Sequence, residues 1–226
     1  LVLGEFQSDI HVSLDAVYVP GEPVTVWYDP GYDHAAALEA TQYIQGQVRV
    51  FDEIYERALT IDSVIDIAVD KLWWKDVRHG VIDVSGTYHG GQQTPVAEVW
   101  MNRTGVYMKG EKVPINEGTA RFKSFLKVDP ITHAPRIIFS PVCLGLLSEL
   151  GFGVNPIDSQ MHVYRWDTDK EGNTVGKTPR DRWNDAIKAV VYGLVDRFGY
   201  VNPQGGGQAY TMQFFGRAKR ATQVGV

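Results

Sequence analysis

The spacing of apolar residues changes near residue 60, and this change constrains the fold more than any other feature of the sequence. Upstream lie three strand-like runs, at residues 24–29, 34–44 and 48–55, separated only by the short turns DPGYD and QGQ. Breaks this tight favour antiparallel hairpins. Downstream, beyond Thr60, which is placed to cap a helix, the apolar residues recur at helical spacing. These residues are Ile61, Val64, Ile65, Ala68 and Leu72.

A second strand type follows this helix. Residues 80–86 form a short apolar run bounded by glycines, which is typical of a buried parallel strand. A strand, helix, strand order requires a crossover connection. The sequence therefore predicts an α/β fold with a mixed central sheet, in which the first three strands are antiparallel and the later strands are parallel, flanked by helices.

The remaining elements can be assigned from local patterns. We predict helices at residues 96–105, 116–126 and 142–151, a strand or loop at 106–113, a strand at 136–141, and a β-hairpin at 161–175 around the DKEGN turn. The last helix is predicted to begin after Thr178, with Pro179 in its first turn and Asp181 completing a capping box. Its expected buried stripe is Trp183, Ile187, Val190, Leu194 and Phe198.

Length and composition indicate one folded unit. The chain has 226 residues, of which 44% are hydrophobic and 22% charged, as in ordinary globular proteins. We expect a single domain over residues 1–200 and a mobile, mildly basic tail over residues 201–226. The sequence has no apolar run of about 20 residues and no secretion signal, so we expect no membrane contact and a cytoplasmic location. The single cysteine, Cys143, is expected to be a buried structural thiol.

Three aspartates are the strongest candidates for chemistry. Asp29 closes a strand, Asp83 interrupts the apolar run VIDV, and Asp185 lies on the last helix. An unpaired carboxylate inside an apolar strand would cost several kcal/mol, so Asp83 needs a partner or a metal. Asp33, in the turn after Asp29, and Asp181 are auxiliary candidates, although turn formation and helix capping also account for them.

Carboxylates from two strands and one helix suit Mg²⁺ or Mn²⁺, which prefer oxygen ligands. Two such ions can activate a water on one side of a phosphodiester and stabilise the leaving oxygen on the other. The net charge of −5 does not exclude a nucleic-acid partner, because clustered metal-binding carboxylates can coexist with a local basic groove.

The sequence resembles the C-terminal nuclease domain of tailed-bacteriophage large terminase subunits. The likeness is carried by WYDPGYDHAAAL at 27–38, VRVFDEIYERALTIDSVI at 48–65, VIDVSG at 81–86, and RIIFSPVCLGLLSEL at 136–150 with VYRWD at 163–167 and DRWNDAIKAVVYGL at 181–194. It implies an RNase H-like fold whose metal-binding acids fall on Asp29, Asp83 and Asp185. Many relatives carry a second aspartate in the last helix where this chain has Lys188, so Asp181 remains an alternative to Asp185.

This resemblance implies a Mg²⁺- or Mn²⁺-dependent endonuclease, with two ions, that cuts double-stranded DNA during phage genome packaging in the cytoplasm of the infected bacterium. No GxxxxGK[ST] phosphate loop occurs in the sequence. The terminase ATPase domain is therefore expected elsewhere in a longer protein, with portal and small terminase as further partners and the isolated domain monomeric. We assign Asp52 and Glu53 to the third strand, where adjacent residues point to opposite faces, rather than to the site.

The DNA contacts and the activity leave alternatives open. Lys170, Lys177 and Arg180 lie close in sequence to Asp185 and are candidates for phosphate contact, with little sequence preference. A loose basic run, for which a solvated face is the better interpretation, comprises Lys109, Lys112, Arg121, Lys123 and Lys127. Two other functions fit the same features: a non-catalytic docking module of the packaging motor that grips a portal or capsid protein through Arg217–Arg220, and another RNase H-like nuclease such as a junction resolvase.

Overall fold

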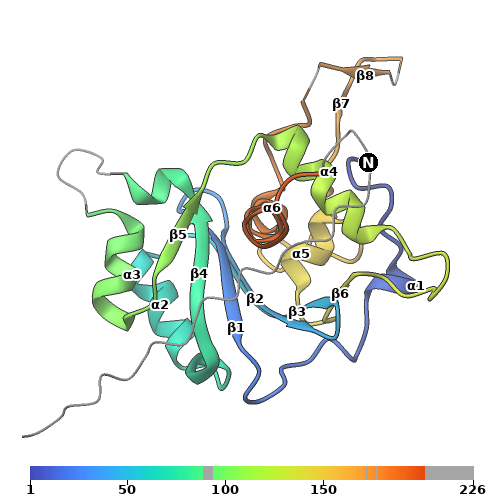
Figure 1. Cartoon of the computed structure of the whole chain (residues 1–226). Coiled ribbons are helices and arrows are strands. Elements are labelled where there is room, and N and C mark those ends of the chain that lie inside the picture. Colours follow the sequence, from blue (N-terminus) through green and yellow to red (C-terminus); the bar gives the residue numbers. More distant parts are fainter. Residues whose placement is uncertain (89–93, 172, 177, 202–226) are drawn as a thin grey trace, which may run out of the picture.

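A six-stranded mixed sheet forms the centre of the molecule, with helices on both faces (Figure 1). The computed structural model describes residues 1–88, 94–171, 173–176 and 178–201. The strand order is β5-β4-β1-β2-β3-β6. The strands are β1 (Val24–Asp29), β2 (Ala36–Ile44), β3 (Gln47–Glu56), β4 (Val77–Asp83), β5 (Met108–Glu111) and β6 (Ile137–Phe139).

The strand directions confirm the predicted mixed sheet. Strand β2 pairs antiparallel with β1 on one side and with β3 on the other. The later strands pair in parallel: β4 with β1, β5 with β4, and β6 with β3. The carboxyl ends of β1 and β4 therefore meet at one edge of the sheet, which also receives the end of β3. The register pairs Tyr28 with Ile82, so the next residues, Asp29 and Asp83, lie at the same height on neighbouring strands.

One face of the sheet is covered by α2 (Ile61–Val69) and α3 (Val96–Thr104), and the other by α4 (Ile115–Leu126), α5 (Leu144–Glu149) and α6 (Asp185–Phe198) (Figure 1). Thr60 caps α2 as predicted, since its hydroxyl accepts the N–H of Ser63 at 3.1 Å. The shorter elements are α1 (Ser8–His11), the 3₁₀ turns η1 (Trp74–Asp76) and η2 (Val84–Thr87), and a two-stranded hairpin, β7 (Asp167–Thr168) with β8 (Thr174–Val175). The hairpin confirms the prediction for residues 161–175, although its paired strands are shorter.

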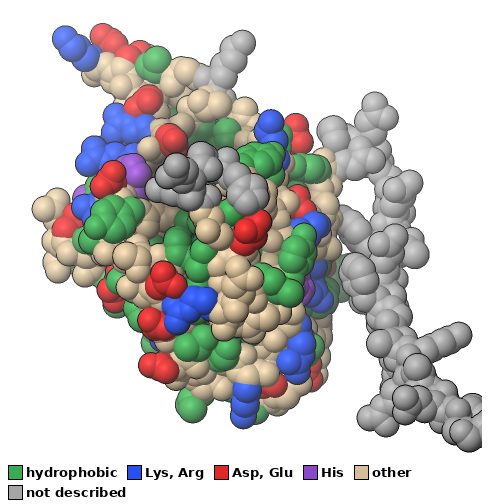
Figure 2. Space-filling model, turned by 90° about the vertical axis from the view of Figure 1, so that its left-hand side faces the viewer, with side chains coloured by type: hydrophobic (Ala, Val, Ile, Leu, Met, Phe, Trp, Pro, Cys, Tyr) green, Lys and Arg blue, Asp and Glu red, His purple; other side chains and the backbone are tan. Residues whose placement is uncertain are grey.

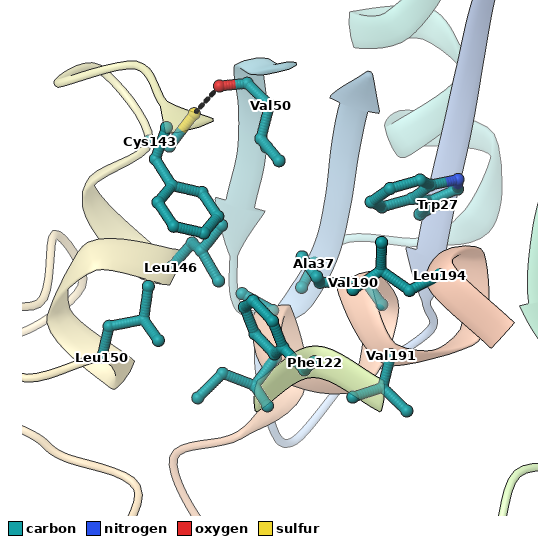
Figure 3. Packing of buried hydrophobic residues seen from close by; sticks show 14 of the residues in the cluster. Trp27, Ala37, Val50, Phe122, Cys143, Leu146, Leu150, Val190, Val191 and Leu194 are labelled. Carbon is teal, nitrogen blue, oxygen red and sulfur yellow. Dashed lines mark hydrogen bonds between the residues drawn. The ribbon is translucent and has the colours of Figure 1, made fainter. Parts of the chain in front are cut away.

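Helix α6 packs directly over β1 because a glycine allows close approach. A Cβ atom on Gly193 would lie 2.0 Å from the indole ring of Trp27. Figure 3 shows Val190, Val191 and Leu194 of this helix in the same apolar cluster as Trp27 and Ala37 of the sheet. This packing holds the first turn of α6 near the sheet edge at which β1 ends.

The predicted start of the last helix was wrong. Helix α6 begins at Asp185, not after Thr178, so Asp181 does not complete a capping box. Arg180 instead donates its backbone N–H to the carbonyl of Arg165, and Trp183 adopts a φ of 57°, which an α-helix does not allow. Trp183 therefore stands outside the helix and is only partly buried, contrary to the predicted buried stripe.

Asp83 also differs from its prediction. It is the last residue of β4 rather than the centre of a strand, is partly exposed, and accepts the N–H of Ser85 at 2.8 Å. The chain turns into η2 there, so the argument from a carboxylate buried within an apolar strand does not hold.

Other expectations concern Cys143, the tail and the membrane. Cys143 is fully buried, as predicted, with its thiol 3.7 Å from the carbonyl of Val50 (Figure 3). Beyond Val201, the predicted tail lies outside the described residues, as do Lys177 and residues 217–220. None of the helices described is both long and apolar enough to cross a bilayer.

Candidate functional site

Asp29, Asp83 and Asp185 gather at one edge of the sheet. Asp29 ends β1, Asp83 ends the neighbouring β4, and Asp185 opens α6, which crosses β1. Burial raises the pKa of Asp29 to about 8, and the charges of Asp185 and Asp83 add to this rise while Lys188 opposes it. Asp29 therefore lies within range of the charges of both Asp83 and Asp185, although the three residues come from segments far apart in the sequence.

Lys188 supplies the positive charge at this edge. Its ammonium Nζ lies 2.7 Å from Oδ1 of Asp181, and its side chain is 25% exposed. Burial raises the pKa of Asp185 as well, and Lys188 is again the strongest opposing charge. The hydrogen bond from Lys188 lowers the pKa of Asp181, whose side chain is largely exposed. Lys188 therefore neutralises part of the carboxylate charge.

Tyr192 is a further member of the cluster for which the sequence indicated no role. It lies on α6 seven residues after Asp185 and is buried. Burial raises the pKa of its hydroxyl above the ordinary value, as do the charges of Asp29 and Asp83 and a hydrogen bond with Asp83. Tyr192 thus links the helix to the end of β4. Its spacing along α6 was the one signal available, but that spacing also fits an ordinary core residue.

The first turn of α6 is held by a buried carboxylate that the sequence analysis missed. Glu149, at the end of α5, is 1% exposed. Its Oε1 accepts the N–H of Asp185 at 3.0 Å and the hydroxyl of Tyr55 at 2.9 Å, and its Oε2 accepts the N–H of Ile187 at 2.9 Å. A carboxylate at a helix N-terminus satisfies free N–H groups and favours the helix dipole. Glu149 therefore caps α6 from 36 residues away.

The carboxyl group of Asp185 has its own anchor. It accepts the backbone N–H of Ala35, which precedes β2, and this hydrogen bond lowers the pKa of Asp185 against the effect of burial. Burial raises the pKa of Glu149 to about 8, and the charge of Asp185 adds to the rise. Both carboxyl groups are therefore held in a poorly hydrated part of the protein.

The donor set suits a hard divalent cation, although the carboxylates do not converge on a single point. Among the residues that the structure describes, no group of three or more His, Cys, Asp or Glu side chains lies close enough to hold a metal ion. The oxygen donors are nevertheless those that Mg²⁺ and Mn²⁺ prefer. Since the charges of Asp185 and Asp83 raise the pKa of Asp29, a cation would relieve this repulsion. Binding would require the side chains to move toward a common centre.

The auxiliary candidates take different positions. Asp33 is exposed on the loop between β1 and β2. Asp52 pairs with Lys71 at 2.9 Å, whereas Glu53 accepts N–H groups of α5, so the two point to opposite faces as predicted.

Two of the predicted DNA-contacting residues, Lys170 and Arg180, lie on and beside the hairpin. Lys170 is exposed at its turn. Arg180 forms an ion pair with Asp167 of β7. Of the loose basic run, Arg121 is buried and donates to the carbonyls of Phe198, Gly199 and Tyr200 at the end of α6.

The mixed sheet, in which antiparallel first strands are followed by parallel ones and helices cover both faces, is an RNase H-like fold. The large terminase from a thermophilic bacteriophage, in complex with ATP-gamma-S, superposes with a TM-score of 0.64 at 15% identity, over 86% of this chain and 45% of that chain. The nuclease domain of the P22 large terminase superposes with a TM-score of 0.55 at 10% identity, over 88% of this chain and 93% of that one.

These similarities confirm the predicted fold, which is that of large terminase nuclease domains. The chain spans less than half the length of the thermophilic phage terminase. No protein-family model matches the sequence, and no curated protein matches it significantly. Identities this low establish the fold alone.

Proposed function

We propose that this domain is a metal-dependent endonuclease that cuts double-stranded DNA during genome packaging by a tailed bacteriophage, with little sequence preference. The gathering of Asp29, Asp83 and Asp185 at one sheet edge, where the charges of Asp83 and Asp185 both act on Asp29, carries this proposal. The similarity of the fold to terminase nuclease domains supports it.

In this proposal, Asp29, Asp83 and Asp185 hold two divalent ions, Mg²⁺ or Mn²⁺. When bound, such ions provide an activated water and stabilise charge on the attacked phosphate and the leaving 3′ oxygen. We assign the third ligand to Asp185 rather than Asp181, because Asp181 is exposed and engaged by Lys188. Asp33 and Asp181 keep auxiliary positions at the rim.

The remaining residues would position and balance the ligands. The hydroxyl of Tyr192 hydrogen-bonds Asp83 and limits its rotation. The Ala35 N–H fixes the carboxyl of Asp185. Lys188 holds the metal-free cluster together by neutralising charge, and we infer that its ammonium remains with Asp181 when the other carboxylates turn toward a cation.

The biological setting follows from the same proposal. Because the chain covers less than half of the thermophilic phage terminase, the ATPase domain would lie elsewhere in the same polypeptide. Portal and small terminase are the partners we expect in the packaging motor, within the cytoplasm of the infected bacterium. The isolated domain is expected to be monomeric.

Plasmid cleavage tests the proposal. Supercoiled plasmid should be nicked and then linearised with Mg²⁺ or Mn²⁺, and should survive with chelator or with Asp83→Asn. Asp196→Asn is the matched control, since Asp196 lies at the far end of α6 and pairs with Lys109. It should cut as the wild type does. An inert wild type would overturn the proposal in favour of a docking module, and preference for branched DNA over duplex would favour a junction resolvase.

A further inference from the structure

A basic and aromatic cluster surrounds Trp183, directly before α6. The imidazole of His162 stacks on the indole, with ring centroids 3.5 Å apart and an interplanar angle of 6°. The guanidinium carbons of Arg182 and Arg57 lie 4.9 Å and 5.5 Å from the indole centroid. We call these four residues the Trp183 cluster. Such cation–π contacts order the guanidinium groups before any ligand arrives.

Chain topology places the Trp183 cluster at the same sheet edge as the aspartates. Arg57 directly follows β3, whose carboxyl end lies at this edge, and the next residue, Ala58, donates its N–H to the carbonyl of Tyr32 on the loop after Asp29 at 3.0 Å. Trp183 lies two residues before Asp185. Figure 2 shows basic side chains and histidine gathered on the left of the molecule, beneath the projecting hairpin.

The backbone at Trp183 is bent in an unfavourable way. A φ of 57° is rare for a residue with a large side chain and costs on the order of 1–3 kcal/mol. The stacked His162 and the two arginines offset this cost. The bend ends the preceding loop and holds the partly exposed indole close to both guanidinium groups.

The charges of Arg57 and Arg182 are not paired in salt bridges. Both side chains are exposed, and within the described residues neither forms a salt bridge with a carboxylate. Arg180 is engaged by Asp167, and Arg103 by Asp62 and Asp66. His162 has its own partner, with Nε2 2.7 Å from Asp158. Besides the hydrogen bond from His162, the charge of Arg57 helps to lower the pKa of Asp158. No described carboxylate forms a salt bridge with either arginine, however, so their N–H groups can bind an anion.

We propose that the Trp183 cluster binds the phosphodiester backbone of duplex DNA beside the candidate metal centre. Guanidinium groups match phosphate geometry through paired N–H donors, and contacts to backbone carry no base preference. The proposal deepens the proposed function by naming where its substrate is held. It assigns DNA contact to Arg57 and Arg182, in addition to the hairpin residue Lys170 and to Arg180.

Salt-dependent DNA binding tests this without cleavage. Fluorescence anisotropy of a labelled short duplex, without divalent metal, gives the slope of log K against log salt, which changes by about 0.9 for each phosphate contact. The double variant Arg57→Ala, Arg182→Ala should lower that slope by about 1.8. The matched control is Lys127→Ala, which removes a positive charge far from the Trp183 cluster. Lys127 lies two residues after Phe125, whose ring packs on Phe198 at the opposite end of α6. Its slope should equal that of the wild type.

The outcomes separate this proposal from the proposed function. An unchanged slope in the double variant, with the fold intact by circular dichroism, overturns the role of the Trp183 cluster even where plasmid is still cut. A loss of about 0.9 with Lys127→Ala, the same per removed charge as in the double variant, overturns it too, since the effect would then reflect overall charge. A reduced slope only in the double variant supports the cluster, and it does so even if the wild type fails to cut DNA.

Discussion

Replacing Glu149 by glutamine should weaken metal binding through the backbone of α6. The carboxylate accepts two backbone N–H groups and one hydroxyl, whereas glutamine offers a single acceptor oxygen and two unwanted donors. One N–H of the first helical turn would then be buried without an acceptor. Above pH 8, where Glu149 is ionised, a lost charge-assisted hydrogen bond and an unsatisfied buried donor together destabilise by about 2–4 kcal/mol.

The effect on the metal should be separable from this loss of stability. Asp185 is the first residue of α6, so a loosened first turn misplaces one proposed ligand. Removing a group that orients a metal ligand typically costs about 10- to 100-fold in affinity or activity. We expect a Mn²⁺ dissociation constant that is higher by this factor, measured by titration calorimetry at pH 8.5, above the pKa of about 8 of Glu149.

Glu53→Gln is the matched control for this substitution. Glu53 accepts the N–H groups of Gly145 and Leu146 at 2.8 and 2.7 Å and so caps α5. These two hydrogen bonds hold α5, whereas those of Glu149 hold α6. Urea unfolding should show both variants destabilised, while only Glu149→Gln binds Mn²⁺ more weakly. Equal metal affinity in the two variants would refute a positioning role for Glu149.

Three further predictions concern the charge and packing of the site. Lys188→Ala should tighten Mn²⁺ binding about 3- to 10-fold by calorimetry, because it removes the main positive charge acting on Asp29 and Asp185; weaker binding would contradict this. The metal-free domain should lose stability from about pH 5 to pH 8 in urea unfolding. In this range Asp29 and Glu149 keep their protons in the folded state but lose them in the unfolded state, so each lowers the free energy of unfolding by up to about 1.4 kcal/mol per pH unit. A free energy of unfolding that rises from pH 5 to pH 8 would contradict this prediction. Gly193→Ala should lower the free energy of unfolding by about 1–3 kcal/mol or more, because a Cβ would meet the Trp27 ring at 2.0 Å; an unchanged melting temperature would refute it.

Local patterns in the sequence were sufficient to predict the sheet. Short turns between β1, β2 and β3 leave only antiparallel pairing, and the helix before β4 requires a crossover. Asp29 was correctly placed at the end of its strand because proline and glycine follow it. These features depend on neighbouring residues, which a sequence displays directly.

The start of α6 could not be predicted in this way. Thr178, Pro179 and Asp181 form a good local capping signal, yet the helix begins at Asp185 because Glu149 provides the acceptors from another helix. Likewise, Asp83 looked buried because its neighbours are apolar, but the chain turns immediately after it. Both errors arise because tertiary contacts outweighed a local preference.

The juxtaposition of Arg57 and Trp183, which was predicted only as part of the buried stripe of the last helix, could not be foreseen for a related reason. They are separated by more than a hundred residues, so no local pattern in the sequence links them. Only the antiparallel pairing of β2 and β3, which returns the chain to the edge where β1 ends, brings them together. The basic run that was visible in the sequence includes Arg121, which is instead buried against the end of α6.

The most direct test of the proposed site is anomalous diffraction from crystals of this domain soaked in Mn²⁺. The proposal predicts one or two peaks in the anomalous difference map between the carboxylates of Asp29, Asp83 and Asp185, with Mn–O distances of about 2.0–2.3 Å. Crystals of Asp83→Asn should lose at least one peak. Ordered carboxylates without a peak between them, or a peak elsewhere on the surface, would contradict the proposed metal centre.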